Sequence, residues 1–330
     1  MHTPSFDGTA AAWQADQSAP RVPGLPHPEP RPPPNLYATP PALGVDISSR
    51  LIRAKRPCAD GYRWYVRHGQ GTATYVELLR ALQMAGRAGD ASWLLQQFGP
   101  TDDVLELDEL SDECLVFPGT VRVRGNVDVA SMIHVGGHLV TRGGVRAGGD
   151  VTVGGDLQCD GALQAEGVVR CASLRLGMPL LAQAVHCAGA LRSDSAVHLR
   201  GELVVGEQAA IRGTLDVAGH VSCTRSLQAL EDVRVGGALR AGHGIRCGGN
   251  LTCDGPLSAG WGLRVGGDIE GHDTIQAGES IVCGGALAAG SGYGIYAGLA
   301  VREADWEHSG QVVSRMRPVS LRSGLWRARP

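Results

Sequence analysis

A repeat of six residues, apolar at its first and third positions, runs through most of the chain. From Val121 the sequence divides into VRVRGN, VDVASM, IHVGGH, LVTRGG, VRAGGD and VTVGGD, and the frame continues to Gly298 with one interruption. The first position is nearly always Leu, Val or Ile, the third is small and apolar, and the last two are mostly Gly, Asp or Ala. Two apolar residues around a polar one predict a short strand with one buried face. The glycines predict a turn after it.

One such unit buries only two small side chains, so it becomes stable only by stacking on its neighbours. The sequence therefore predicts an all-β fold, a β-helix solenoid with three hexads per coil and about ten coils. We favour a right-handed helix, because the usual left-handed hexapeptide pattern has one aliphatic position and this repeat has two. Residues 169–184 fill 16 positions where three hexads need 18, so the register is expected to slip there.

Composition divides the chain into four parts. Residues 1–45 are rich in proline and lack an apolar period, which predicts a disordered tail. Residues 46–114 are expected to form a small helical cap domain, residues 115–301 the β-helix, and residues 302–330 a C-terminal cap or tail.

Local signals give more detail within the cap domain. The segment GYRWYVRHGQG, which starts at Gly61, predicts one or two short strands, and helices are expected to follow it. Thr74 and Glu77 have the spacing of a capping box at the start of the first helix. Asp90 is the expected N-cap of the second helix, and Gly99 is its expected end.

Large aromatic residues gather at the two ends of the repeat region, where they are expected to cover the edges of the terminal coils. They are Tyr62, Trp64, Tyr65, Tyr75, Trp93, Phe98 and Phe117 on one side, and Tyr293, Tyr296, Trp306 and Trp326 on the other. Between them the repeats contain only Trp261.

Residues that carry chemistry are scattered. Seven of the nine cysteines take the small third position of the hexad, where they are expected to be buried structural residues: Cys159, Cys171, Cys187, Cys223, Cys247, Cys253 and Cys283. Cys171 and Cys187 are expected to stack on adjacent coils without a disulfide. No CxxC pair, phosphate loop or Ser/His/Asp set is found, and His134, His186 and His198 take outward second positions. We therefore expect no catalytic residue, cofactor or metal, and no enzyme.

Charge limits the choice of partner. The net charge of −3 and pI near 6.4 argue against nucleic acid and anionic membranes. Residues 121–301 contain 14 arginines and 16 acids, which also argues against a DNA-mimicking surface. The N-terminus has neither the basic nor the apolar region of a signal peptide, so a cytoplasmic location is expected. The expected partner is another protein, and the candidate contact residues are Arg234, Arg240, Arg246, Arg264, Asp102, Asp103, Glu106, Asp108 and Glu109.

The units VRAGGDVTVGGDLQCDGALQA and LEDVRVGGALRAGHGIRCGG resemble the bactofilin family of polymer-forming bacterial proteins. The resemblance implies a right-handed β-helix that assembles end to end as a scaffold. The preceding helical segment, the longer rod and the aromatic ends depart from that pattern, so we favour a monomer or homodimer over a filament.

Two further resemblances suggest other functions. The hexads, the helical N-terminal segment and the end GYGIYAGLAVR are similar to solenoid proteins of bacterial polymorphic-toxin systems. This similarity implies an immunity protein that binds and neutralises a toxin, which is the preferred hypothesis. The hexads also resemble hexapeptide-repeat acyltransferases, whose catalytic histidine lies near a loop that leaves the coil. Here the only excursion, residues 172–184, is short and His186 is the nearest histidine, so this alternative is disfavoured.

Overall fold

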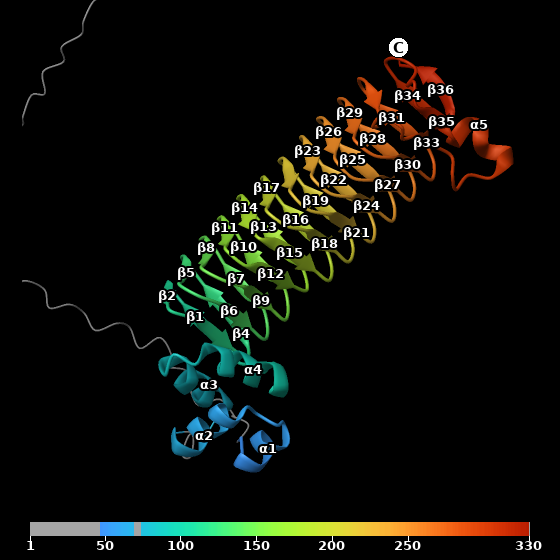
Figure 1. The fold of residues 1–330 in the computed structure, drawn as a ribbon. Coiled ribbons are helices and arrows are strands. Elements are labelled where there is room, and N and C mark those ends of the chain that lie inside the picture. The colour runs from blue at the N-terminus through green and yellow to red at the C-terminus, as the bar shows by residue number, and fades with distance from the viewer. Residues whose placement is uncertain (1–46, 69–73, 330) are drawn as a thin grey trace, which may run out of the picture. The chain divides into compact units, whose positions relative to one another are not determined.

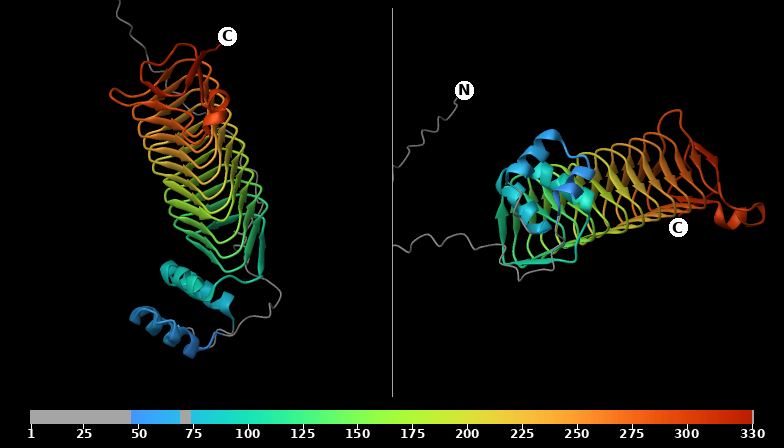
Figure 2. Two further views of the ribbon diagram at one scale, coloured as in Figure 1. Left: turned by 90° about the vertical axis from the view of Figure 1, so that its right-hand side faces the viewer. Right: turned by 90° about the horizontal axis from the view of Figure 1, so that it is seen from below.

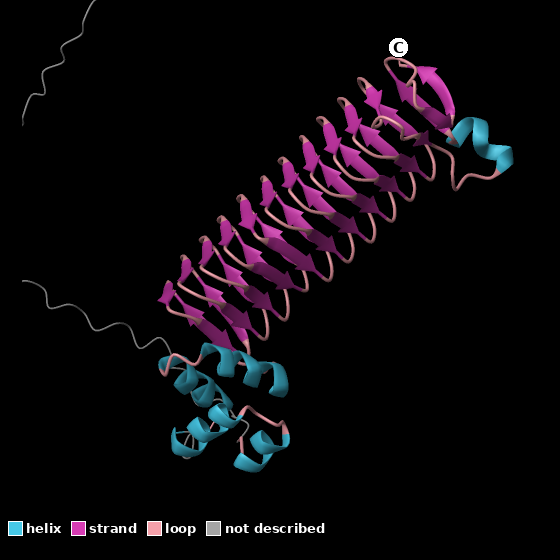
Figure 3. Ribbon diagram, in the orientation of Figure 1, coloured by secondary structure: helices cyan, strands magenta, loops and turns pink. Residues whose placement is uncertain are grey.

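The computed structural model describes residues 47–68 and 74–329, and the tail expected over residues 1–45 lies outside them. Four helices precede a long series of short strands (Figures 1 and 3), and one short helix lies near the C-terminus. The helices are α1 (Ser49–Ala54), α2 (Ala59–His68), α3 (Tyr75–Met84), α4 (Ala88–Phe98) and α5 (Trp306–Ser309), the last preceded by the 3-10 turn η1 (Glu303–Asp305).

The strands form three parallel sheets that coil around one core, which confirms the β-helix (Figure 2). Sheet A contains β1 (Val104–Leu107), β4 (Thr120–Val123), β7 (Leu139–Thr141), β10 (Leu157–Cys159), β13 (Leu174–Leu176), β16 (Leu191–Ser193), β19 (Ala209–Ile211), β22 (Leu227–Ala229), β25 (Ile245–Cys247), β28 (Leu263–Val265), β31 (Ile281–Cys283), β34 (Gln311–Ser314) and β36 (Leu325–Ala328). Sheet B contains β2 (Leu110–Asp112), β5 (Val127–Val129), β8 (Val145–Ala147), β11 (Leu163–Ala165), β14 (Leu180–Ala182), β17 (Val197–Leu199), β20 (Leu215–Val217), β23 (Val233–Val235), β26 (Leu251–Cys253), β29 (Ile269–Gly271) and β32 (Leu287–Ala288). Sheet C contains β3 (Leu115–Phe117), β6 (Ile133–Val135), β9 (Val151–Val153), β12 (Val168–Cys171), β15 (Ala184–Cys187), β18 (Leu203–Val205), β21 (Val221–Cys223), β24 (Leu239–Ala241), β27 (Leu257–Ala259), β30 (Ile275–Ala277), β33 (Ile295–Tyr296) and β35 (Leu321–Ser323).

The strand register confirms three hexads per coil. Val121 lies beside Leu139, 18 residues later, so equivalent hexad positions stack on one another. In the interrupted region the coil shortens, and Val169 lies beside Val185, only 16 residues later. The expected slip is therefore absorbed by shorter turns, and the three sheets continue through it. The right-handed sense of the helix stays a prediction.

The solenoid extends beyond both boundaries suggested by the hexad frame. Its first strands, β1 and β2, precede residue 115, so the acidic run is part of the first coil. Two residues separate β1 from β2, whereas three residues separate consecutive strands in the regular hexads. Because this turn is shorter, the six-residue repeat is not visible in this part of the sequence. After residue 301 the chain makes an excursion through η1 and α5 and then adds β34, β35 and β36 to sheets A and C.

The core is a stack of first-position and third-position side chains. Leu157, Leu203 and Leu239 are fully buried, and the seven third-position cysteines are buried as expected. All nine cysteines are free thiols, and Cys171 lies beside Cys187 without a disulfide. Burial raises the pKa of the Cys223 thiol to about 12 and that of Cys159 to about 11.

These thiols make the inward assignment measurable. Only Cys58 is exposed, and the reactive form of a thiol is its thiolate, so native protein should react rapidly with a thiol reagent at Cys58 alone. All nine cysteines should react after unfolding in guanidinium chloride. The matched variant Cys58→Ser should show no fast phase. Several rapidly reacting thiols in native C58S would contradict the buried positions.

The helical segment departs from the sequence predictions at two places. Residues 61–68 of the segment expected to form strands belong instead to helix α2, because Tyr62 and Tyr65, three residues apart, turn toward the same buried cluster. Residues 69–71 of this segment lie outside the described residues. The N-cap of α4 is Arg87, so the prediction of Asp90 is wrong. Asp90 lies in the first turn of α4 and forms an ion pair with Arg87.

Two other predictions for this segment are confirmed. The Thr74 hydroxyl accepts a hydrogen bond from the Glu77 backbone N–H, and the Glu77 carboxylate accepts one from the Thr74 N–H, which completes the capping box. Gly99 ends α4 with a φ of 80°, a conformation that favours glycine.

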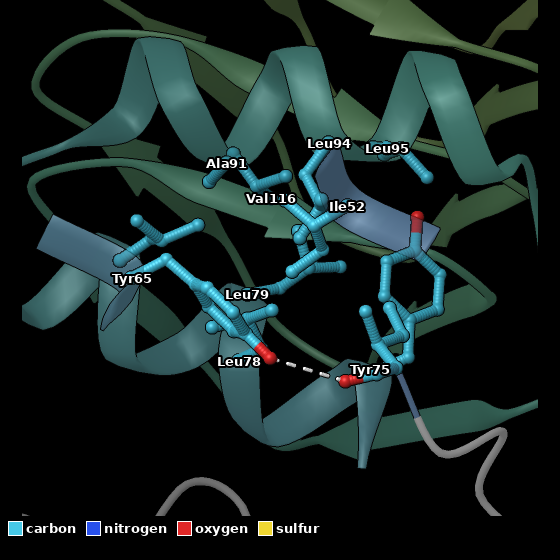
Figure 4. Close-up of a cluster of buried hydrophobic side chains, with 11 residues drawn as sticks. Ile52, Tyr65, Tyr75, Leu78, Leu79, Ala91, Leu94, Leu95 and Val116 are labelled. Atoms are coloured by element: carbon cyan, nitrogen blue, oxygen red, sulfur yellow. Dashed lines mark hydrogen bonds between the residues drawn. The ribbon is translucent and has the colours of Figure 1, made fainter. Parts of the chain in front are cut away.

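Helices α3 and α4 pack against the outer face of sheet C at β3, and α4 also reaches β6. Val116, an outward residue of β3, is buried in the helical cluster beside Leu79 and Leu94 (Figure 4). On the next strand, His134 is also buried, and its Nδ1 lies 2.7 Å from the Ser92 hydroxyl of α4. Burial lowers the pKa of His134. His134 lies on the outward face of β6 as expected, but α4 covers this position.

One side chain also closes the edge of sheet C. The Gln83 amide donates a hydrogen bond to the Val116 carbonyl and accepts one from the Val116 N–H, both at 2.8 Å. These two backbone groups face away from β6, where another strand would otherwise pair. Gln83 therefore replaces a neighbouring strand at the start of sheet C.

Candidate functional site

Sheet A carries more arginines at its outward strand positions than either of the other two sheets. From β4 to β36 these positions include six arginines and no acid, and the only outward acid of sheet A is Glu106 on β1. Sheet C also has no outward acid, but its arginines, Arg170, Arg240 and Arg322, do not lie on adjacent strands. Sheet B is mixed, since Asp216 lies between His198 and Arg234 on adjacent strands. We call the following outward residues of sheet A the arginine face: Arg122, Arg175, Arg192, Arg246, Arg264 and Arg327.

Four of these arginines form two like-charged pairs. Arg175 lies beside Arg192, and Arg246 lies beside Arg264, each pair on adjacent strands and exposed. Within residues 47–68 and 74–329, none of the four has an ion-pair partner. Like charges directly opposite each other on neighbouring strands lower stability. These pairs are therefore not explained by the stability of the fold.

An aromatic stack borders the second pair. Trp261 and His243 follow sheet C strands of consecutive coils, and their rings stack with centroids 4.1 Å apart and planes 6° from parallel. Trp261 remains 54% exposed, which leaves much of its ring accessible. A depression of about 370 Å³, the Trp261 depression, lies between this stack and sheet A, and its lining includes Gln228, His243, Arg246, Trp261, Arg264 and Glu279.

The four arginines selected from the sequence do not share one surface. Arg246 and Arg264 both line the Trp261 depression. Arg234 lies on β23 of sheet B, where its guanidinium is 3.3 Å from the Asp232 carboxylate, and Arg240 lies on β24 of sheet C. The selection also omitted Arg175, Arg192 and His243. Arg175 and Arg192 are one coil apart in the sequence, and His243 is one coil from Trp261. This spacing could have identified them.

The acidic candidates lie on the first coil, whereas β25 with Arg246 is the ninth strand of sheet A. Glu106 pairs with Arg122 at 3.5 Å, and Asp108 pairs with Arg124 at 3.0 Å. The remaining candidates, Asp102, Asp103 and Glu109, flank β1. Strands β1 and β2 begin their sheets, and charged residues beside an open edge oppose pairing with another chain. The acidic run therefore lies at these open edges, where Glu106 meets the arginine face only at Arg122.

Histidine and acid pairs occur elsewhere on the surface. His186 Nε2 lies 2.8 Å from a Glu202 carboxylate oxygen, and His272 Nδ1 lies 2.7 Å from an Asp254 carboxylate oxygen. Across the described residues, no three His, Cys, Asp or Glu side chains are grouped closely enough to hold a metal ion. In the same residues, every helix is too short or too polar to cross a membrane.

Comparisons with family models, curated proteins and solved structures return no match.

Proposed function

We propose that this chain is a non-catalytic, protein-binding solenoid that contacts its partner through the arginine face and the Trp261 depression. The observation that carries the proposal is the exposed pair Arg246 and Arg264, which lacks an ion partner among the described residues and lies beside exposed Trp261. Trp and Arg are the side chains that contribute most to protein interfaces. The matching partner surface carries carboxylates for the arginines and an apolar or aromatic side chain for Trp261.

Acids beside the arginine face favour a protein over a polynucleotide. Acidic side chains occupy the turns on both sides of sheet A: Asp156, Glu207 and Glu279 before its strands, and Asp160, Asp194, Asp232 and Asp268 after them. A nucleic acid backbone requires a continuous basic track, and these acids would repel its phosphates. A protein surface can place single carboxylates between them.

The preferred partner is a toxin domain that the chain neutralises in the cytoplasm. Binding alone is sufficient for neutralisation when a rigid surface covers the site of the toxin. A stacked β-helix provides such a surface, because its strands are held on both sides by parallel neighbours.

Charge reversal on the arginine face tests this proposal. The double variant R246E/R264E, co-expressed with the product of the adjacent gene, should bind it on the order of 100-fold more weakly than the unmodified chain. The loss arises because two attractions become repulsions at the same place. Isothermal titration calorimetry gives the affinities.

The matched control is R142E/R240E, which makes the same charge change at two exposed arginines outside sheet A. It should retain the affinity of the unmodified chain. Equal losses in the two double variants would reject the arginine face as the contact surface.

Self-assembly is the second candidate function, and one observation favours it. The first coil carries the acidic run at the open edges of β1 and β2, whereas the last strand of sheet A, β36, is exposed and lies in a segment with five arginines and no acid: Arg315, Arg317, Arg322, Arg327 and Arg329. Opposite charges at the two ends are compatible with head-to-tail contact. Gln83 opposes such contact at sheet C, because it already occupies the edge of β3.

A further inference from the structure

The last coil of the solenoid lacks its sheet B strand. Sheets A and C continue through β34, β36 and β35, but sheet B ends at β32. In a complete coil, the nine residues 266–274 connect β28 of sheet A to β30 of sheet C and include the sheet B strand β29. Only the six residues 315–320 connect β34 to β35. This connection is three residues shorter than the one in a complete coil. The chain therefore passes directly from sheet A to sheet C without forming a sheet B strand.

As a result, backbone groups of β32 have no partner among the described residues. In the two preceding coils, the N–H of Leu251 donates to the Asp268 carbonyl, and the N–H of Ile269 donates to the Ala286 carbonyl. Leu287 takes the same position in β32, but its N–H and C=O have no hydrogen-bond partner in the part of the chain that the structure describes. Its side chain is buried, and its open backbone edge is the hydrogen-bonding pattern that an added strand recognises.

A cavity of about 510 Å³ occupies the place of the missing strand. Its lining includes Leu287, Ala288, Tyr293, Met316, Val319 and Arg322. Met316 and Val319 expose apolar side chains at its border. The border is also basic, because Arg317 lines the cavity with Arg322, and residues 310–329 contain no acid.

We propose that this gap binds an extended, acidic peptide segment of another protein, which adds as a strand to β32. The peptide backbone would pair with the N–H and C=O of Leu287, and one apolar side chain would cover Leu287 at the end of the core. Carboxylates of the same segment would meet Arg317 and Arg322. This site is separate from the arginine face, so either can fail without the other.

The test uses the full chain and two fluorescein-labelled peptides, EVTVE and KVTVK, which share a β-prone centre and differ in charge. Fluorescence anisotropy should show binding of EVTVE and not of KVTVK. Residue-resolved hydrogen exchange should show a rapidly exchanging Leu287 amide in the free protein, with slow exchange at Leu251 and Ile269. Addition of EVTVE should slow the exchange of the Leu287 amide.

Two variants change the site in different ways. R317E/R322E should bind EVTVE about tenfold more weakly, while R142E/R240E should bind it as the unmodified chain does. A variant with three residues inserted after Met316 allows the chain to complete its own coil, and it should lose EVTVE binding while its Leu287 amide becomes protected.

Several results would overturn the proposal. They are equal binding of the two peptides, no binding of EVTVE at millimolar concentration, or a Leu287 amide that is already protected in dilute free protein. Protection that rises with protein concentration in the absence of peptide would also overturn it, because a second copy of the chain would then be the occupant.

Discussion

Replacing Leu239 with alanine is expected to lower the free energy of unfolding by about 3 kcal/mol. Leu239 is 0% exposed and stacks between Val221 and Leu257 of the neighbouring coils. Removing its side chain leaves a cavity, because backbone hydrogen bonds hold the coils on both sides at a fixed spacing. Denaturant unfolding followed by circular dichroism gives the change, with m-values compared to check that the same unit unfolds.

The matched control is Leu230→Ala, in the turn between β22 and β23. Leu230 is 53% exposed, so this variant should change the free energy of unfolding by less than about 0.5 kcal/mol. Similar losses in the two variants would contradict the assignment of inward and outward positions.

Replacing Val116 with aspartate is expected to cost about 4 kcal/mol, the second large effect. Val116 is an outward residue of β3 but only 2% exposed, because α3 and α4 cover it. A carboxylate there loses its hydration and gains no cation in the helical cluster. The helices should detach from sheet C while the distant coils remain folded, which limited proteolysis between α4 and β1 would detect.

Val204→Asp is the control for this effect. Val204 holds the same outward position on β18 of sheet C and is 39% exposed, with no helix over it. This change should alter the free energy of unfolding by less than about 0.5 kcal/mol. A comparable loss at Val204 would show that an outward carboxylate destabilises sheet C without a helix over it, and the role of the helices in the Val116 result would then be rejected.

The β-helix was predictable because the local pattern and the global fold agree. Each hexad places an aliphatic residue inward at its first position and a small residue at its third, so alternation along a strand and stacking between coils require the same residues. The inward cysteines follow from this frame without further information. The capping box at Thr74 and the glycine at the end of α4 are local signals of the same kind.

Other features depend on contacts between distant residues. Val116 and His134 take the outward middle positions of β3 and β6, and only the packing of α3 and α4 buries them. Helix α2 contains aromatic residues that favour strands, and tertiary packing overrides that preference. The short connection of residues 315–320 follows the excursion through η1 and α5, where the six-residue repeat has already ended.

The candidate site could be predicted from the sequence only in part. Arg246 and Arg264 are 18 residues apart, so the coil length predicted from the hexads already places them side by side. The stack of His243 and Trp261 follows from the same spacing. The sequence does not show that sheet A carries the most outward arginines, because this requires the assignment of every hexad to one of the three sheets.

Sedimentation velocity of the intact chain tests the central claim most directly, because it separates binding to another protein from binding to itself. At micromolar concentration the chain alone should sediment as one small species, a monomer or homodimer. With the co-expressed product of the adjacent gene it should shift to a single larger complex, and R246E/R264E should remove that shift. Assemblies of the chain alone that grow with concentration, seen as filaments by negative-stain microscopy, would contradict the account.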